Sequence, residues 1–147
     1  MKNKMSRISY GKNVYNFEEI NAVLKTLKNS TQMGVSVNKF ETRIARLFNK
    51  RYGLMVNSGS SALILALKVL NLKKDSEVII PCLNFGTAIS SIVLNNLKPV
   101  FVDCEVNTLQ IDISKIEKKI NKKTKVLFIP NLIGNIPDWE NIKKIAK

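Results

Sequence analysis

The chain has 147 residues, 45% of them hydrophobic, and a mean hydropathy of -0.02, which is enough apolar material for one α/β domain with a sizeable core. Its formal net charge is +13, and it has no histidine, so catalytic pairs of histidine with serine or cysteine are excluded. No apolar run reaches the roughly 20 residues of a membrane helix, and residues 1–4 are basic without the apolar stretch of a signal peptide behind them.

The excess of positive charge has two interpretations. One is a polyanionic partner, either nucleic acid or a negatively charged membrane surface. The other is a lysine-rich chain whose charges lie on solvated helix faces and in the loops after them. No aromatic residues interleave with the lysines as a single-strand binding surface requires, so we favour the second interpretation and expect neither nucleic acid nor membrane as a partner.

The first part of the chain is predicted to be helical up to a short strand. Apolar spacing predicts a helix over residues 17–27, residues 31–37 read as a loop, and Asn38 is the expected N-cap of a second helix. Residues 54–56 read as a short buried strand. We therefore divide the chain into residues 1–37, an N-terminal arm with a helix and a loop, and residues 38–147, a larger domain.

From residue 57 onward, helical and strand patterns alternate. Helices are predicted over residues 60–70, 85–94, 112–120 and 138–147, and strands over residues 77–80, 99–102 and 125–129. Strands that are apolar throughout and separated by helices predict an α/β fold, a parallel sheet with helices on both faces. With residues 54–56 included, the sheet has four predicted strands.

The turns that follow successive strands should lie along one edge of this sheet, where ligands of such folds bind. They comprise residues 57–61, 81–85, 103–107 and 130–135. The turns over residues 71–76 and 121–124 are charged and should face the opposite edge.

The turn Asn57-Ser58-Gly59-Ser60-Ser61-Ala62 is the clearest candidate for a ligand site. A small, hydroxyl-rich turn that leads into a helix presents free backbone N–H groups at the positive end of the helix dipole, which suits a phosphate. The alternative is a simple N-cap made by Ser58 or Ser60, with no ligand. The motifs GxGxxG and GxxxxGK[ST] are absent, so dinucleotide and P-loop sites have no support.

Three further residues fall at the predicted ligand edge. By its residue type alone, Phe85 is interpreted as a core residue, because aromatic side chains favour burial. Asn131 and Asn135 are interpreted as ordinary loop-capping residues. Cys82 and Cys104 have no metal-ligand spacing, and we expect both to be reduced, in a cytoplasmic protein without a metal site.

An ordered set of short segments carries a family resemblance. It comprises residues 34–41, 57–62, 81–88, 98–103, 108–112, 122–125 and 134–138. In order and spacing, from about Gly11 to Lys147, these segments resemble the start of the DegT/DnrJ/EryC1/StrS sugar aminotransferases and dehydratases. The resemblance implies an incomplete large domain of the type I fold of pyridoxal 5′-phosphate (PLP) enzymes.

The same resemblance implies the site residues. Gly59 and Ser60 would bind the PLP phosphate, Phe85 would stack on the pyridine ring, and Asn131 would belong to the cofactor site at a position where many members carry histidine. Asp103 matches an aspartate that we take to be structural. The Ser-rich turn and the Gly134-Asn135 pair resemble the 3-dehydratase branch.

The resemblance also implies the intact reaction. It would be amino transfer to a nucleotide-linked keto sugar from an amino donor, or loss of the C3 hydroxyl, by a homodimer in surface polysaccharide or lipopolysaccharide synthesis. The family's pyridinium-pairing aspartate and Schiff-base lysine are expected beyond Lys147. None of the chain's own residues is therefore assigned a catalytic role, and we expect the chain alone to be inactive.

Overall fold

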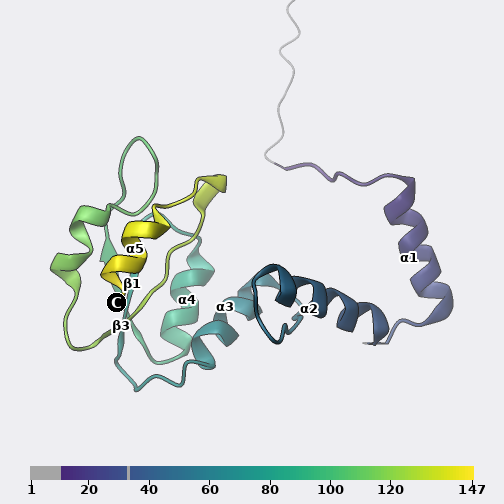
Figure 1. The fold of residues 1–147 in the computed structure, drawn as a ribbon, viewed down its shortest axis with the longest axis horizontal. Coiled ribbons are helices and arrows are strands. Elements are labelled where there is room, and N and C mark those ends of the chain that lie inside the picture. The colour runs from purple at the N-terminus through teal and green to yellow at the C-terminus, as the bar shows by residue number, and fades with distance from the viewer. Residues whose placement is uncertain (1–10, 33) are drawn as a thin grey trace, which may run out of the picture. The chain divides into compact units, whose positions relative to one another are not determined.

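The computed structural model describes residues 11–32 and 34–147 (Figure 1). The described residues up to 55 form one compact unit, and residues 56–147 form a second. The first ten residues of the predicted N-terminal arm lie outside the described residues. No helix of the described part is long and apolar enough to cross a membrane. The assignment of residues 1–37 to an arm and 38–147 to a PLP-binding domain stays a prediction.

The first unit contains two helices. Helix α1 (Phe17–Asn29) matches the predicted helix and begins with a capping box, in which Asn16 and Glu19 each bond the other's backbone N–H. Helix α2 (Val35–Leu47) begins four residues before the predicted start, with Gly34 as its N-cap. The prediction that Asn38 is the N-cap is wrong, because its N–H already donates to the Gly34 carbonyl, 3.0 Å away, inside the first turn.

The strand predicted over residues 54–56 is not formed. A strand needs a partner for its backbone groups, and no described strand pairs with this run. Instead the N–H of Met55 donates to Glu41 Oε1 at 2.7 Å. Gly53 allows this close approach to α2, since a Cβ there would lie 2.7 Å from the Glu41 carbonyl oxygen.

The second unit is built on a parallel sheet of three strands, in the order β2-β1-β3. Strand β1 (Glu77–Pro81) is central, with β2 (Lys98–Val102) on one side and β3 (Thr124–Leu127) on the other. These are the three strands predicted beyond residue 57, and the parallel arrangement is confirmed. The predicted fourth strand is missing for the reason given above.

Helices cover both faces of the sheet, as predicted. Val78 and Ile80 of β1 pack with helices α3 (Gly59–Lys68) and α4 (Gly86–Leu94) on one face. Ile79 points the other way and packs with Ile116 and with helix α5 (Trp139–Ile145). The connections from β1 to β2 and from β2 to β3 run in opposite directions across the sheet, so right-handed crossovers place them on opposite faces.

The segment predicted as a helix over residues 112–120 forms two short 3-10 helices, η1 (Ile113–Lys115) and η2 (Glu117–Lys119). Ile113 and Ile116 are three residues apart, and a helix of three residues per turn puts both on the side that packs against the core. β-Branched side chains also disfavour a regular α-helix. Burial of Ile116, which is fully covered, therefore decides the local structure.

Candidate functional site

The carboxyl ends of the three strands and the starts of α3 and α4 form one edge of the second unit, which we call the carboxyl edge. Helix α4 follows β1 directly and α3 leads into it, so both run opposite to β1 and begin at this edge. The two helices pack together, and Asn95 Nδ2 after α4 donates to the Ile64 carbonyl of α3 at 3.1 Å. The start of α3 and the turn after β1 therefore lie at the same edge, as the topology predicts. Among residues 11–32 and 34–147, no hydrogen bond joins the Asn57–Ala62 turn to the turns over residues 103–107 and 130–135, so the gathering of all four turns stays a prediction.

Ser58 is the N-cap of α3. Its Oγ accepts a hydrogen bond from the N–H of Ser61 at 3.2 Å and donates to Ser61 Oγ at 3.1 Å. Gly59 and Ser60 then occupy the first two helical positions, whose N–H groups have no acceptor within a helix. Among residues 11–32 and 34–147, neither amide donates a hydrogen bond. The cap and a ligand site are therefore compatible, since the cap uses a different N–H.

Open space lies over the start of α3. A Cβ added at Gly59 would meet no atom within 4 Å. Two free N–H groups at the positive end of a helix, with room in front of them, can bind a phosphate. The chain's own residues at this point thus fit the phosphate end of PLP.

Phe85 is exposed at the carboxyl edge. It is the N-cap of α4, and its N–H donates to Asn84 Oδ1 at 2.8 Å. Its side chain is 71% exposed, so its interpretation as a core residue is wrong for the described chain. An aromatic side chain open to solvent at the start of α4 can stack on a planar ring.

Asn131 contacts a tryptophan and does not cap its loop. Its Oδ1 accepts a hydrogen bond from Trp139 Nε1 at 3.2 Å, and it makes no side-chain cap bond to the short helix η3 (Leu132–Gly134) that follows. Asn135 does bridge loops, since its Nδ2 donates to the Thr108 carbonyl at 2.8 Å. The capping interpretation is therefore wrong for Asn131.

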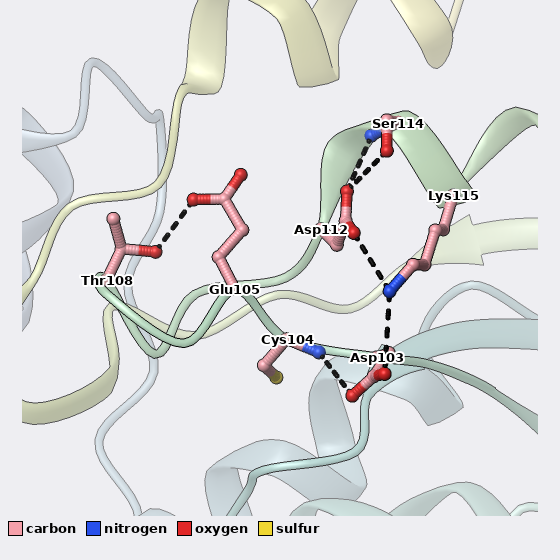
Figure 2. Close-up of polar contacts among 7 residues, drawn as sticks. All are labelled: Asp103, Cys104, Glu105, Thr108, Asp112, Ser114 and Lys115. Carbon is pink, nitrogen blue, oxygen red and sulfur yellow. Dashed lines mark hydrogen bonds and ion pairs between the residues drawn. The ribbon is translucent and has the colours of Figure 1, made fainter.

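A charged cluster stabilises the loop after β2 (Figure 2). Lys115 Nζ lies 3.0 Å from Asp112 Oδ2 and 3.4 Å from Asp103 Oδ2. Asp103 also accepts from the N–H of Cys104, and Asp112 accepts from Ser114. These contacts agree with the structural role that the resemblance implies for Asp103.

The cluster shifts the titration of its members. The hydrogen bond from the Cys104 N–H, followed by Lys115, lowers the pKa of Asp103. The hydroxyl of Ser114, followed by Lys115, lowers the pKa of Asp112. The hydrogen bond to Asp112 raises the pKa of Lys115, so all three groups are charged at neutral pH.

Sequence reasoning missed the residues that join the loops at this edge. Gln110 is 6% exposed, and its Nε2 donates to the Leu132 carbonyl at 3.2 Å, across 22 positions of sequence. A contact of that span leaves no local pattern. The bond from the Ser114 N–H to Asp112 could be predicted from the sequence, because aspartate side chains often accept a hydrogen bond from the backbone two residues further on.

The turns of the carboxyl edge supply groups that can bind a ligand but no amine or imidazole. They contain neither lysine nor histidine, and Lys115 is engaged by two carboxylates. Among residues 11–32 and 34–147, no three histidine, cysteine, aspartate or glutamate residues are grouped to hold a metal ion. The arrangement can hold an anion and a flat ring.

Three comparisons place the chain among known proteins. A sequence model described as the DegT/DnrJ/EryC1/StrS aminotransferase family matches residues 14–147. The chain is 35% identical over 119 residues to the GDP-4-keto-6-deoxy-D-mannose 3-dehydratase of Escherichia coli O55:H7 (strain CB9615 / EPEC), a match that covers 77% of the chain and 31% of that protein. It is 36% identical over 114 residues to the GDP-perosamine synthase of Escherichia coli O157:H7, covering 78% and 31%.

The fold comparison agrees. A solved GDP-4-keto-6-deoxymannose-3-dehydratase, with a trapped PLP-glutamate geminal diamine, superposes with a TM-score of 0.88 and 31% identity, over 95% of this chain and 38% of that one. The predicted fold class and resemblance are confirmed. The chain spans about a third of the length of the curated relatives it matches (31% in both cases above).

Proposed function

Because the chain belongs to the DegT/DnrJ/EryC1/StrS aminotransferase family, we propose that it is the N-terminal portion of a PLP-dependent enzyme that modifies a nucleotide-linked keto sugar. The observation that carries the proposal is the carboxyl edge. There, free amides at the start of α3 and an exposed aromatic ring at the start of α4 lie on the same side of the sheet.

Four residues of this edge would take part in binding. The N–H groups of Gly59 and Ser60 and the Ser60 hydroxyl would hold the phosphate, and Phe85 would lie against the pyridine ring. Asn131, whose Oδ1 accepts a hydrogen bond from Trp139 Nε1, would complete the site. When bound, PLP supplies an electron sink for exchange of an amino group or loss of a hydroxyl.

The reaction that we favour is amino transfer to the keto sugar in surface polysaccharide or lipopolysaccharide synthesis. Dehydration at C3 is the second candidate, supported by the Gly134-Asn135 pair and by a 3-dehydratase relative at 35% identity. Amino transfer is favoured because the family model that matches residues 14–147 is described as an aminotransferase family. The residue that separates them is expected beyond Lys147, so the gene sequence downstream decides: lysine indicates the aminotransferase, and histidine the dehydratase.

The phosphate site can be tested with pyridoxamine 5′-phosphate, which has no aldehyde to react with surface lysines. Binding is followed through the fluorescence of Trp139, the chain's one tryptophan. Gly59→Ala places a methyl group in front of the free amides and should weaken binding at least tenfold, without loss of thermal stability. Pyridoxamine, which lacks the phosphate, should bind both proteins equally.

Gly86→Ala is the matched control. Gly86 is also the first residue of a helix, and a Cβ there also meets nothing within 4 Å. Binding that falls equally in both variants, or that does not depend on the phosphate, would show that the start of α3 is not the phosphate site.

We also propose a cytoplasmic homodimer. The apolar side chains of α1 remain exposed, among them Phe17, Val23 and Leu27, and a second copy could cover them. The cytoplasmic location is proposed because both cysteines are free thiols, and thiols stay reduced in the cytoplasm. Sedimentation equilibrium measures the mass of the particle and so tests the dimer. The mass of a monomer at all concentrations, up to 100-fold above that of the binding assays, would contradict it.

A further inference from the structure

The loops at the amino ends of the three strands form a second continuous edge, the amino edge. The N–H of Lys98 donates to the Ser76 carbonyl at 2.9 Å, and the N–H of Glu77 donates to the Lys123 carbonyl at 2.8 Å. The loop before β1 therefore contacts the loops before β2 and β3. A cavity lined by Thr124, Ile145 and other residues places the end of α5 beside them.

Exposed lysines gather at this edge from segments that are distant in sequence. Two precede β1, two precede β3, and two lie in η2, while the last turn of α5 adds Lys143 and Lys144. The six from the loops and η2 are Lys73, Lys74, Lys118, Lys119, Lys122 and Lys123.

Three carboxylates lie among these eight lysines. Asp75 lies 3.8 Å from Lys98, Glu77 accepts a hydrogen bond from Asn121, and Glu117 is the first residue of η2. The opposite, carboxyl edge is rich in acidic groups, including Asp103 and Asp112. The second unit is therefore electrically polar, with its positive end at the amino edge.

The ligand proposed at the carboxyl edge does not account for this charge. Helix α3 has ten residues between the two edges, a length of about 15 Å. Screening at physiological ionic strength reduces interactions beyond about 8 Å. The amino-edge lysines therefore contribute little to binding a phosphate at the start of α3.

The chemistry of the edge fits a membrane surface better than a nucleic acid. Every arginine of the chain precedes residue 52, and the amino-edge segments contain no aromatic residue, so the groups that read bases or stack on them are missing. Exposed aliphatic side chains stand among the lysines instead: Val69, Leu70 and Ile120. Lysines interleaved with aliphatic groups are typical of surfaces that lie on anionic lipid.

Contrary to the expectation from composition alone that a membrane is not a partner, we propose that the amino edge docks on the surface of an anionic lipid bilayer. The lysines attract the lipid head groups, and the aliphatic side chains enter the boundary between head groups and acyl chains. The acidic carboxyl edge then faces the water, where its proposed small-molecule site stays open.

The test measures binding of the 147-residue chain to vesicles of 30% phosphatidylserine in phosphatidylcholine, by co-sedimentation. The first variant carries Lys73→Gln, Lys74→Gln, Lys122→Gln and Lys123→Gln. The control removes the same charge from the first unit, through Lys25→Gln, Lys28→Gln, Lys39→Gln and Lys50→Gln. Each lysine near such a surface changes affinity about fivefold, so the four substitutions of the first variant together should weaken binding about 600-fold. The control should bind nearly as the unmodified chain.

Two further measurements complete the test. Arginine at the same four amino-edge positions keeps the charge and should restore binding, and all variants should keep the circular dichroism spectrum, because exposed substitutions change stability little. Equal losses in both glutamine variants, binding to pure phosphatidylcholine, or preferential binding of duplex DNA at the same salt concentration would each overturn the proposal.

Discussion

Asn95 should stabilise the packing of the two helices that begin at the carboxyl edge. It is half-buried, and its Nδ2 donates to the Ile64 carbonyl of α3 at 3.1 Å and to the Ser91 carbonyl of α4 at 2.8 Å. The substitution Asn95→Ala removes both hydrogen bonds. It leaves the helices' own backbone bonds in place.

The magnitude follows from the two lost bonds. Each contributes about 1 kcal/mol net. The Asn95 N–H donates to the Ile92 carbonyl and does not replace the lost bond at Ser91, so we expect the free energy of unfolding to fall by about 1–2 kcal/mol. For a unit of this size, about 4–8 °C of melting temperature accompanies each kcal/mol. Urea unfolding followed by circular dichroism measures the change.

Asn95→Asp provides a sharper control. It keeps the shape of the side chain but turns a carboxylate toward two carbonyl oxygens, so its pKa should rise in the folded state. A raised pKa gives stability that is present at low pH and lost as pH rises through the folded-state pKa. The variant should therefore be less stable than Asn95→Ala at pH 7 and approach it below pH 4. A change of less than about 0.3 kcal/mol for Asn95→Ala, or no pH dependence for Asn95→Asp, would refute the reasoning.

Three other predictions concern the second unit. Ile116→Ala should lower the free energy of unfolding by about 2–5 kcal/mol, because Ile116 is fully buried. Ile120→Ala should lower it much less, since that side chain is 41% exposed. Equal losses of the two variants in urea unfolding would contradict this prediction. Ser58→Ala should cost about 1 kcal/mol by removing the cap of α3, and an unchanged urea midpoint would show that the cap is not formed. Besides the Cys104 N–H and the Ser114 hydroxyl, Lys115 lowers the pKa values of Asp103 and Asp112 in the folded protein. The stability that this gives is present above the unfolded-state pKa values of the two carboxyl groups, and it is lost as pH falls through their folded-state pKa values. Lys115→Met should therefore move the midpoint of acid unfolding to higher pH, and an identical midpoint would count against the cluster.

Local patterns in the sequence were sufficient for most elements of the second unit. The runs that form β1, β2 and β3 are apolar and bounded by proline or polar turns, and their order implied a parallel sheet. The carboxyl edge followed from that topology, because chain order and right-handed crossovers leave few other arrangements. Gly59, Ser60 and Phe85 were found because they lie in the turns that this rule selects, and their roles in binding stay predictions.

Pairing and burial between distant segments were decided only by the tertiary structure. Residues 54–56 have a strand-like composition, but without a partner strand their amides turn to Glu41. Residues 112–120 have a helical composition, but burial of Ile116 against the core selects 3-10 turns. The bond from Gln110 to Leu132 has no local signal.

The sequence by itself determined the family, the order of the elements and the turns that form the ligand edge, because these depend on neighbours within a few residues. It also gave the charge of +13 and the expectation that the charged turns over residues 71–76 and 121–124 share one edge. The tertiary structure adds the lysines of η2 and α5 to that edge and places Asp103 and Asp112 at the other. The physical reason is that a parallel sheet sorts its loops by strand end, so charges far apart in sequence become neighbours in space.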